Sequence, residues 1–237
     1  MQNKFNHTYT MMLKGLISNS MSEKVFDLFD EMTIKLDSFT LTVLFNTCPR
    51  GKCSSIEIAQ NLYRFLHDHD KVTYAAMING FGLNGMDHEA AELYKTVPMN
   101  LRDEITHSCV LNTYSHSGLL DKARIIFNEI PVKTVKIITV MIACLSRLFL
   151  FDGAQKLLDE YEKTNMVSFV KYMALLYGLR NSRNRILSEK IYNRMKSLFL
   201  NQKENLLSGA ILLSNIYSSI GEHQLSNDFR FDQKKKN

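Results

Sequence analysis

The sequence predicts an all-α fold, an α-solenoid of about seven helix–turn–helix repeats, and three observations support this prediction. The chain has only 10 glycines and 3 prolines in 237 residues, too few for the dense turns of an all-β sandwich. It contains an internal repeat of about 34 residues. Within each repeat, apolar residues recur at the spacing of an amphipathic helix.

The repeat emerges when the sequence is aligned with itself. Three segments that begin at Thr8, Thr73 and Thr106 align without gaps, and each continues into a similar second half. Weaker copies fall between and after them. The equivalent positions, spaced about 31 to 34 residues apart, are Tyr9, Leu41, Tyr74, His107, Ile138 and Tyr172. A further copy begins near Gly209, so the repeats account for nearly the whole chain.

The residue pattern within each unit predicts two helices joined by a short turn. In the third unit, apolar side chains recur over 77–81 and again over 90–97, which predicts one helix in each half. The turns between the halves contain Gly85 and Gly118, and glycine tolerates the left-handed conformation that ends a helix. Pro98 and Pro131 follow two of the second helices, where proline prevents the helix from continuing.

Stacking of the hairpins explains how such short units are stabilised. One hairpin cannot bury both of its apolar faces, whereas neighbouring copies cover each other and form a continuous core. The first helices of successive units then line one concave surface and place one side chain per unit at regular spacing along it. This surface is the expected binding site.

Composition and charge narrow the functional classes. The formal net charge of +5 is compatible with a polyanionic partner. The four cysteines include no C-x-x-C pair, which favours a reducing compartment. The longest apolar stretch, 135–150, contains Lys136 and Arg147, so we expect no membrane span, and the first seven residues resemble neither a signal peptide nor an organellar presequence.

We also expect no metal, cofactor or catalytic centre in this chain. A metal site at Cys53, His67 and His69 is disfavoured, because solvent exposure explains the two histidines and Cys48 occupies an apolar helical position. No glycine-rich phosphate loop or nucleophile elbow occurs in the sequence.

The residues of the repeat distinguish between two families with this period. Tetratricopeptide units open with a tryptophan motif, and this chain has no tryptophan. The segment Val72–Phe81, followed by Glu89–Tyr94, closely resembles a pentatricopeptide unit instead. The resemblance covers nearly the full chain and implies a right-handed α-solenoid that binds single-stranded RNA.

The order of the units resembles the PLS subclass of pentatricopeptide proteins. The resemblance implies a repeat array over 1–168, with units starting near 6, 38, 71, 104 and 135. Two extension motifs with a short basic tail would occupy 169–237. Proteins of this subclass direct cytidine-to-uridine RNA editing or processing in mitochondria or plastids, so the resemblance implies a mitochondrial location, with the cytoplasm as the alternative.

A deaminase domain called DYW commonly follows such arrays, and its zinc chemistry needs H-x-E and P-C-x-x-C motifs. This chain has neither, so we expect no enzyme activity here. A deaminase or editing-factor partner, or a C-terminal segment missing from this sequence, would supply the catalysis.

The resemblance also assigns the residues that read RNA, at the fifth and last positions of each unit. The pairs are Thr10 with Asp37, Thr42 with Asp70, Ala75 with Asp103, and Ser108 with Thr134, and Thr139 is the fifth residue of the next unit. By family analogy a Thr–Asp pair favours guanine. The simpler alternative is that the hydroxyl residues merely suit the first turn of a helix.

Basic residues gather between 180 and 203, with Glu189 as the single acid. We expect phosphate contacts from some of them, and the alternative is a solvated helix face. The candidates are Arg180, Arg183, Arg185, Lys190 and Arg194. The tyrosines at 9, 74 and 172 could stack on bases, but their spacing favours core packing. The rival for the whole protein is a protein-binding scaffold, either a tetratricopeptide-like adaptor or an array that lost RNA binding.

Overall fold

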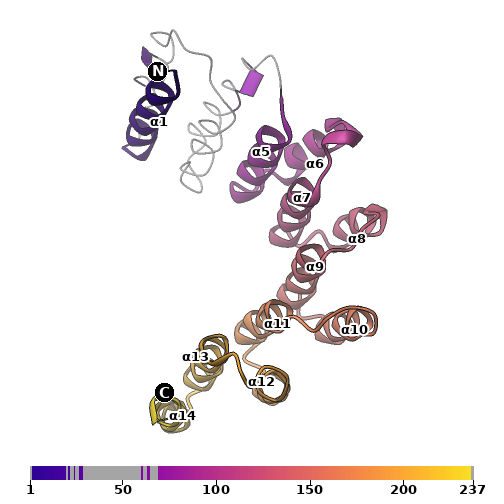
Figure 1. Ribbon diagram of the computed structural model, residues 1–237, viewed down its shortest axis with the longest axis vertical. Helices are drawn as coiled ribbons and strands as arrows, with labels where there is room; N and C mark the ends of the chain where they lie inside the picture. Colours follow the sequence, from indigo (N-terminus) through magenta and orange to yellow (C-terminus); the bar gives the residue numbers. More distant parts are fainter. Residues whose placement is uncertain are drawn as a thin grey trace. The chain divides into compact units, whose positions relative to one another are not determined.

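The computed structural model describes residues 2–19, 21, 24, 27–28, 60, 63–64 and 69–235. The chain divides into two compact units, Met1–Ile126 and Phe127–Asn237, and each is described by itself. All regular secondary structure in the described residues is helical (Figure 1), which confirms the predicted all-α fold.

In the first unit, both helices of one hairpin contact the first helix of the next hairpin. Helix α5 (Lys71–Leu83) packs against both α6 (Asp87–Thr96) and α7 (Glu104–His116). A short 3-10 helix (Met99–Leu101) follows Pro98 and leads into α7. The unit also holds α1 (Gln2–Ser18), and α8 (Leu120–Glu129) crosses the boundary between the units.

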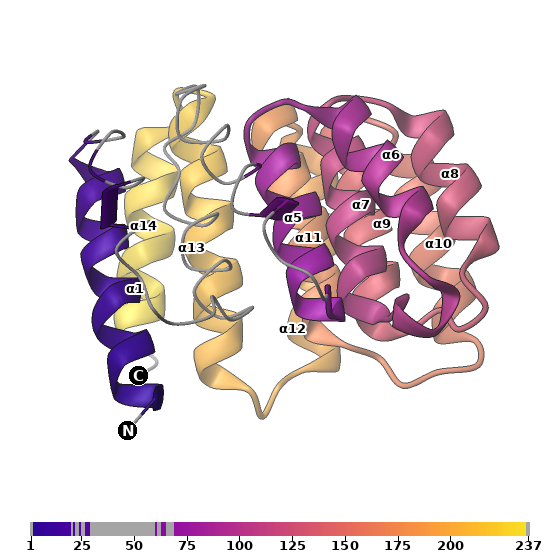
Figure 2. The ribbon, with the colours of Figure 1, turned by 90° about the horizontal axis from the view of Figure 1, so that it is seen from above.

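The second unit repeats this hairpin plan. Its helices are α9 (Val135–Arg147), α10 (Phe151–Glu162), α11 (Phe169–Ser182), α12 (Arg185–Leu198), α13 (Lys203–Ser219) and α14 (His223–Lys235). Helix α11 lies between α9 and α13 and contacts both, so the first helices form a row, with α10 and α12 along one side of it (Figures 1 and 2).

The turns within the hairpins share one backbone feature, a residue with a positive φ angle. Gly85 and Gly118 adopt positive φ angles of 75° and 72°, as the sequence predicts for helix ends. At the equivalent turns of the next two hairpins, Phe149 (φ 60°) and Arg183 (φ 53°) take the same left-handed conformation. A non-glycine residue in this conformation is strained by its Cβ, so the turn geometry is maintained there by the surrounding helices.

The core lies where first helices pack on each other and on their hairpin partners. Ile78 on α5 and Leu111 on α7 are fully buried in the first unit, and Ile142 and Leu175 are fully buried in the second. Burial of one such side chain contributes about 1.5–3 kcal/mol relative to exposure. Tyr172 is also fully buried, which confirms its predicted core role, whereas Tyr9 and Tyr74 are half-buried.

Three buried tyrosines of the second unit make its stability sensitive to alkaline pH. Burial, followed by a hydrogen bond from each hydroxyl to a carboxylate, raises the pKa of Tyr172 and Tyr217, and burial alone raises the pKa of Tyr192. Unfolded tyrosine loses its proton near pH 10, while these folded tyrosines retain theirs. The unfolded state therefore binds fewer protons above about pH 10, and the free energy of unfolding must fall there.

The measurement is urea denaturation at a series of pH values, combined with the ultraviolet absorbance of tyrosinate, which no tryptophan obscures in this chain. Tyr172→Phe is the control, and it should make the pH dependence shallower. A free energy of unfolding that stays constant between about pH 9 and 11 would contradict the prediction.

Candidate nucleic-acid interface

The last residue of each described repeat is the N-cap of the next first helix. Asp70 caps α5 by accepting a hydrogen bond from the Thr73 backbone N–H at 2.8 Å. Asp103 caps α7 and forms a capping box with Thr106. Thr134 caps α9 through the Ile137 N–H. These predicted RNA-reading residues therefore have a structural role, because an N-cap contributes about 0.5–2 kcal/mol to stability.

The fifth residues lie one turn further along the same helices and are less accessible. Thr10, Ala75 and Ser108 are buried, and Thr139 is half-buried. The Ser108 hydroxyl donates to the Glu104 carbonyl at 2.6 Å, and the Thr139 hydroxyl donates to the Val135 carbonyl at 2.7 Å. Each of these two hydroxyls thus keeps only its acceptor capacity for a ligand.

Two of the predicted positions, Asp37 and Thr42, lie outside the described residues. The structure therefore describes only Thr10 of the first predicted pair and only Asp70 of the second.

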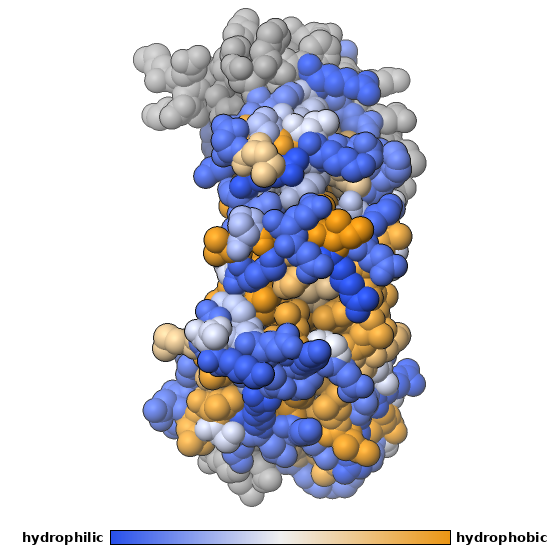
Figure 3. Space-filling model, turned by 90° about the vertical axis from the view of Figure 1, so that its right-hand side faces the viewer, coloured by the Kyte–Doolittle hydropathy of each residue, from blue (hydrophilic) through white to orange (hydrophobic). Residues whose placement is uncertain are grey.

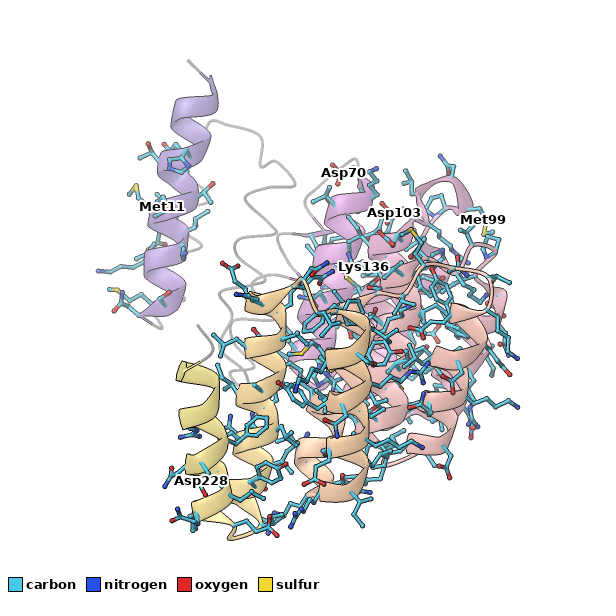
Figure 4. The ribbon with its side chains drawn as sticks, turned by 60° about the horizontal axis from the view of Figure 1, so that its bottom comes forward. Met11, Asp70, Met99, Asp103, Lys136 and Asp228 are labelled. Carbon is cyan, nitrogen blue, oxygen red and sulfur yellow. The ribbon has the colours of Figure 1, made fainter. Side chains whose placement is uncertain are left out.

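The structure brings the pair Ala75 and Asp103 together in one groove between α5 and α7, with a volume of about 200 Å³. Figure 4 shows Asp70 and Asp103 at the same end of these two neighbouring helices. Val72 and Ile105 also line the groove, and their aliphatic side chains are 42% and 48% exposed. Both residues occupy the second position of their units.

Val72 and Ile105 are not among the RNA-reading residues that the repeat predicts. The signal that could have found them is their register: each is an apolar residue in the first turn of its helix, two residues before the Tyr74 or His107 column of the repeat. An apolar residue at an exposed register position is a sign of a contact surface.

The electrostatics of this groove depend on the two oxygens of Asp103. Its Oδ1 accepts hydrogen bonds from the Ile105 and Thr106 N–H groups at 3.0 and 2.9 Å. Its Oδ2 lies 3.8 Å from the Lys71 Nζ and makes no hydrogen bond to another described residue. One carboxylate oxygen therefore fixes the helix start, and the other is left to accept a donor from a ligand.

The second unit has a larger groove between α9 and α11, with a volume of about 450 Å³. The predicted residue Thr139 lies in it, together with Arg180 from the basic stretch. The other lining residues are Ala143, Arg147, Val170, Met173, Ala174, Tyr177, Gly178 and Asn181. Both grooves therefore run between consecutive first helices, which are the elements that the repeat predicts for ligand contact.

Two of the five predicted phosphate contacts in the basic stretch are paired with carboxylates. Arg194 donates to Asp159 at 2.8 Å and to Glu162 at 3.1 Å, and Arg185 pairs with Glu189 and Glu222. Arg180, Arg183 and Lys190 are not held by any carboxylate that the described residues place within ion-pair distance. Figure 3 displays the side of the second unit on which α10 and α12 lie, and hydrophilic residues are interspersed with hydrophobic ones there.

The described part of the chain holds no group of three or more potential metal ligands, and Cys48, Cys53 and His67 lie outside it. Within the described residues, neither Cys109 nor Cys144 forms a disulfide bond. Among the helices described, none has the length and apolar content needed to cross a bilayer.

Comparisons with known proteins agree with the repeat. The family model described as PPR repeat matches residues 7–35, 72–97 and 105–135, the three segments that align with each other without gaps. The chain is 24% identical over 274 aligned residues to the pentatricopeptide repeat-containing protein At3g16610 of Arabidopsis thaliana. That alignment covers 97% of this chain and 41% of the relative.

Solved structures share the fold. The crystal structure of the pentatricopeptide repeat protein PPR10 from maize matches 98% of this chain and 34% of its own, with a TM-score of 0.67 and 19% identity. The structure of PPR10 in complex with an 18-nt psaJ RNA element matches with a TM-score of 0.73 and 16% identity, over 97% of this chain and 35% of that one. At these identities the likeness concerns the arrangement of helical hairpins.

Proposed function

We propose that this chain, which carries PPR repeats, binds single-stranded RNA along its first helices and reads one base per repeat. It would act as the recognition factor for cytidine-to-uridine editing or processing of RNA in a mitochondrion. A deaminase partner or a further segment would supply the catalysis. The observation that carries the proposal is the groove between α5 and α7, in which the fifth and last residues of one unit meet between two exposed aliphatic side chains.

The chemistry of that groove suits a nucleobase. Val72 and Ile105 offer apolar contact to the two faces of a planar ring, and Asp103 Oδ2 offers an acceptor to an N–H on its edge. Lys71 at the rim adds a positive charge for the phosphate backbone. PPR10, which shares the fold, has been crystallised with an 18-nt RNA element, and this supports RNA as the ligand class.

Arg180, Arg183 and Lys190 are the proposed phosphate contacts in the second unit. Arg185 and Arg194 are already held by carboxylates, so a phosphate would have to compete with Glu189, Glu222, Asp159 or Glu162 for them.

The first test adds a reading residue to the groove. Ala75 has no hydrogen-bonding side chain, so Ala75→Thr creates a Thr–Asp pair with Asp103. We expect guanine to be enriched about threefold to tenfold at one position of the RNA selected from a randomised single-stranded pool, the range for one added hydrogen bond.

The matched variant is Asp103→Asn, which keeps the N-cap because asparagine and aspartate cap equally well. Its amide adds a donor, so the base preference at the same position should change while the helical circular dichroism stays the same. Identical RNA pools from the wild type and both variants would contradict base reading in this groove. Retention of no RNA by the wild type would refute RNA binding itself.

A further inference from the structure

The groove between α9 and α11 extends well beyond the predicted reading residue Thr139. Arg147, eight residues further along α9, also lines it, which is a distance of about 12 Å at the rise of an α-helix. Its volume of about 450 Å³ is within the usual range for small-ligand sites. The groove is therefore long enough for a base and its neighbouring phosphate at a point away from the helix start.

Tyr177 on α11 is an unusual residue in this groove. Tyr172, Tyr192 and Tyr217 of the same unit are buried, whereas Tyr177 is 54% exposed and lines the groove. It makes no ring contact with another described residue. An exposed tyrosine ring offers a flat stacking surface that any base can use, because every base has a π-face.

The charges around Tyr177 favour a polyanion. Arg147 and Arg180 both line the groove, together with Asn181, and the lining includes no carboxylate. Arg180 is exposed and pairs with no acid among the described residues. A groove that holds an exposed aromatic ring and two arginines is complementary to a nucleotide, in which a planar base adjoins a phosphate.

We propose that Tyr177 stacks on a base of single-stranded RNA, while Arg147 and Arg180 contact the adjacent phosphate. This site rests on the proposed RNA binding and adds to it a contact that does not depend on the fifth and last residues. The Tyr177 site would also make α11 an RNA-binding helix. This helix begins at residue 169, where the predicted extension motifs start. The bound strand would then reach past the repeat array.

The test uses tryptophan fluorescence, because the chain contains no tryptophan. Tyr177→Trp places a single reporter in the groove, and a base stacked on it should quench its emission when a randomised single-stranded RNA pool is added. Inorganic polyphosphate, which has the charge but no bases, should leave the emission unchanged. The control reporter is Ile125→Trp on α8, at a side chain that is 57% exposed and outside both grooves, and its emission should not respond.

Binding of the same RNA pool provides the second readout. Tyr177→Ala should weaken binding roughly 5- to 150-fold, the range for loss of one stacked base, and Tyr177→Phe should stay within about twofold of the wild type. If the wild type binds RNA but Tyr177→Ala binds equally well and the emission of the Tyr177→Trp variant does not change, the Tyr177 site is refuted and the proposed function stands. If the wild type binds no RNA, both are refuted.

Discussion

Glu162→Ala is expected to lower the free energy of unfolding by about 3–5 kcal/mol, the cost of leaving a buried charge without its partner. Lys171 is fully buried, and its Nζ lies 3.8 Å from Glu162 Oε1, with the Tyr161 ring 4.2 Å away. Burial lowers the pKa of Lys171 even beside this carboxylate. Glu162 Oε2 also accepts hydrogen bonds from the Tyr172 hydroxyl at 2.9 Å and from Arg194 at 3.1 Å.

Lys171→Met is the matched variant. It removes the buried ammonium and keeps a long apolar side chain, while Glu162 retains its bonds to Tyr172 and Arg194. Its loss of stability should therefore be well below that of Glu162→Ala. The double variant should recover part of the loss, since no buried ammonium is left unpaired.

Urea denaturation of the wild type, the two single variants and the double variant gives the coupling energy of the pair. Additive effects, with no recovery in the double variant, would show that Lys171 and Glu162 do not stabilise each other.

Gly178→Ala is expected to lower the free energy of unfolding by about 1–3 kcal/mol, because α9 and α11 approach each other too closely at this point for a methyl group. A Cβ at Gly178 would lie 2.2 Å from the Ser146 Cβ and 3.0 Å from the Ser146 carbonyl carbon. Backbone atoms cannot rotate away, so the two helices would have to separate. Gly178 also lines the groove between them, so RNA binding there should change as well.

Gly153→Ala is the control for the same exchange in a helix with space. A Cβ at Gly153 would meet its nearest atom, on Leu145, at 3.8 Å, which is an ordinary contact. Alanine favours helix over glycine by about 0.5–1 kcal/mol, so this variant should be slightly more stable than the wild type. Thermal denaturation followed by circular dichroism compares the two variants. Equal stability of both would contradict the close approach of α9 and α11.

Local residue patterns predict much of the fold. Gly85 and Gly118 mark two of the turns because glycine adopts the left-handed conformation without strain. Helices α5, α7 and α9 begin at residues 71, 104 and 135, near which the units are expected to start. The period puts the start of the last repeat near Gly209, whereas α13 begins at Lys203. Its first turn is polar and has no side-chain cap, so no apolar signal marks it.

The site is less accessible to prediction, because its geometry depends on residues far apart in the chain. Arg194 looks like a free cation within its own stretch, but its partners Asp159 and Glu162 are 35 and 32 residues away. Arg185 has Glu189 nearby, yet its second partner, Glu222, is 37 residues away. The repeat assigns its last residues to RNA reading, and the capping role of Asp70 and Asp103 appears only with the helix starts. Tyr177 has no distinguishing pattern, since only burial separates it from the core tyrosines.

The most direct measurement of the central claim is equilibrium binding of the full chain to an RNA motif enriched from the randomised pool, compared with a scrambled strand and with the duplex form of the motif. Base reading along a single strand predicts that the selected single strand binds more tightly than the scrambled one, that the duplex competes poorly, and that higher salt weakens binding. Equal binding to all three RNAs, or no binding even at low salt, would contradict it, and the grooves between the first helices would then have to serve another ligand.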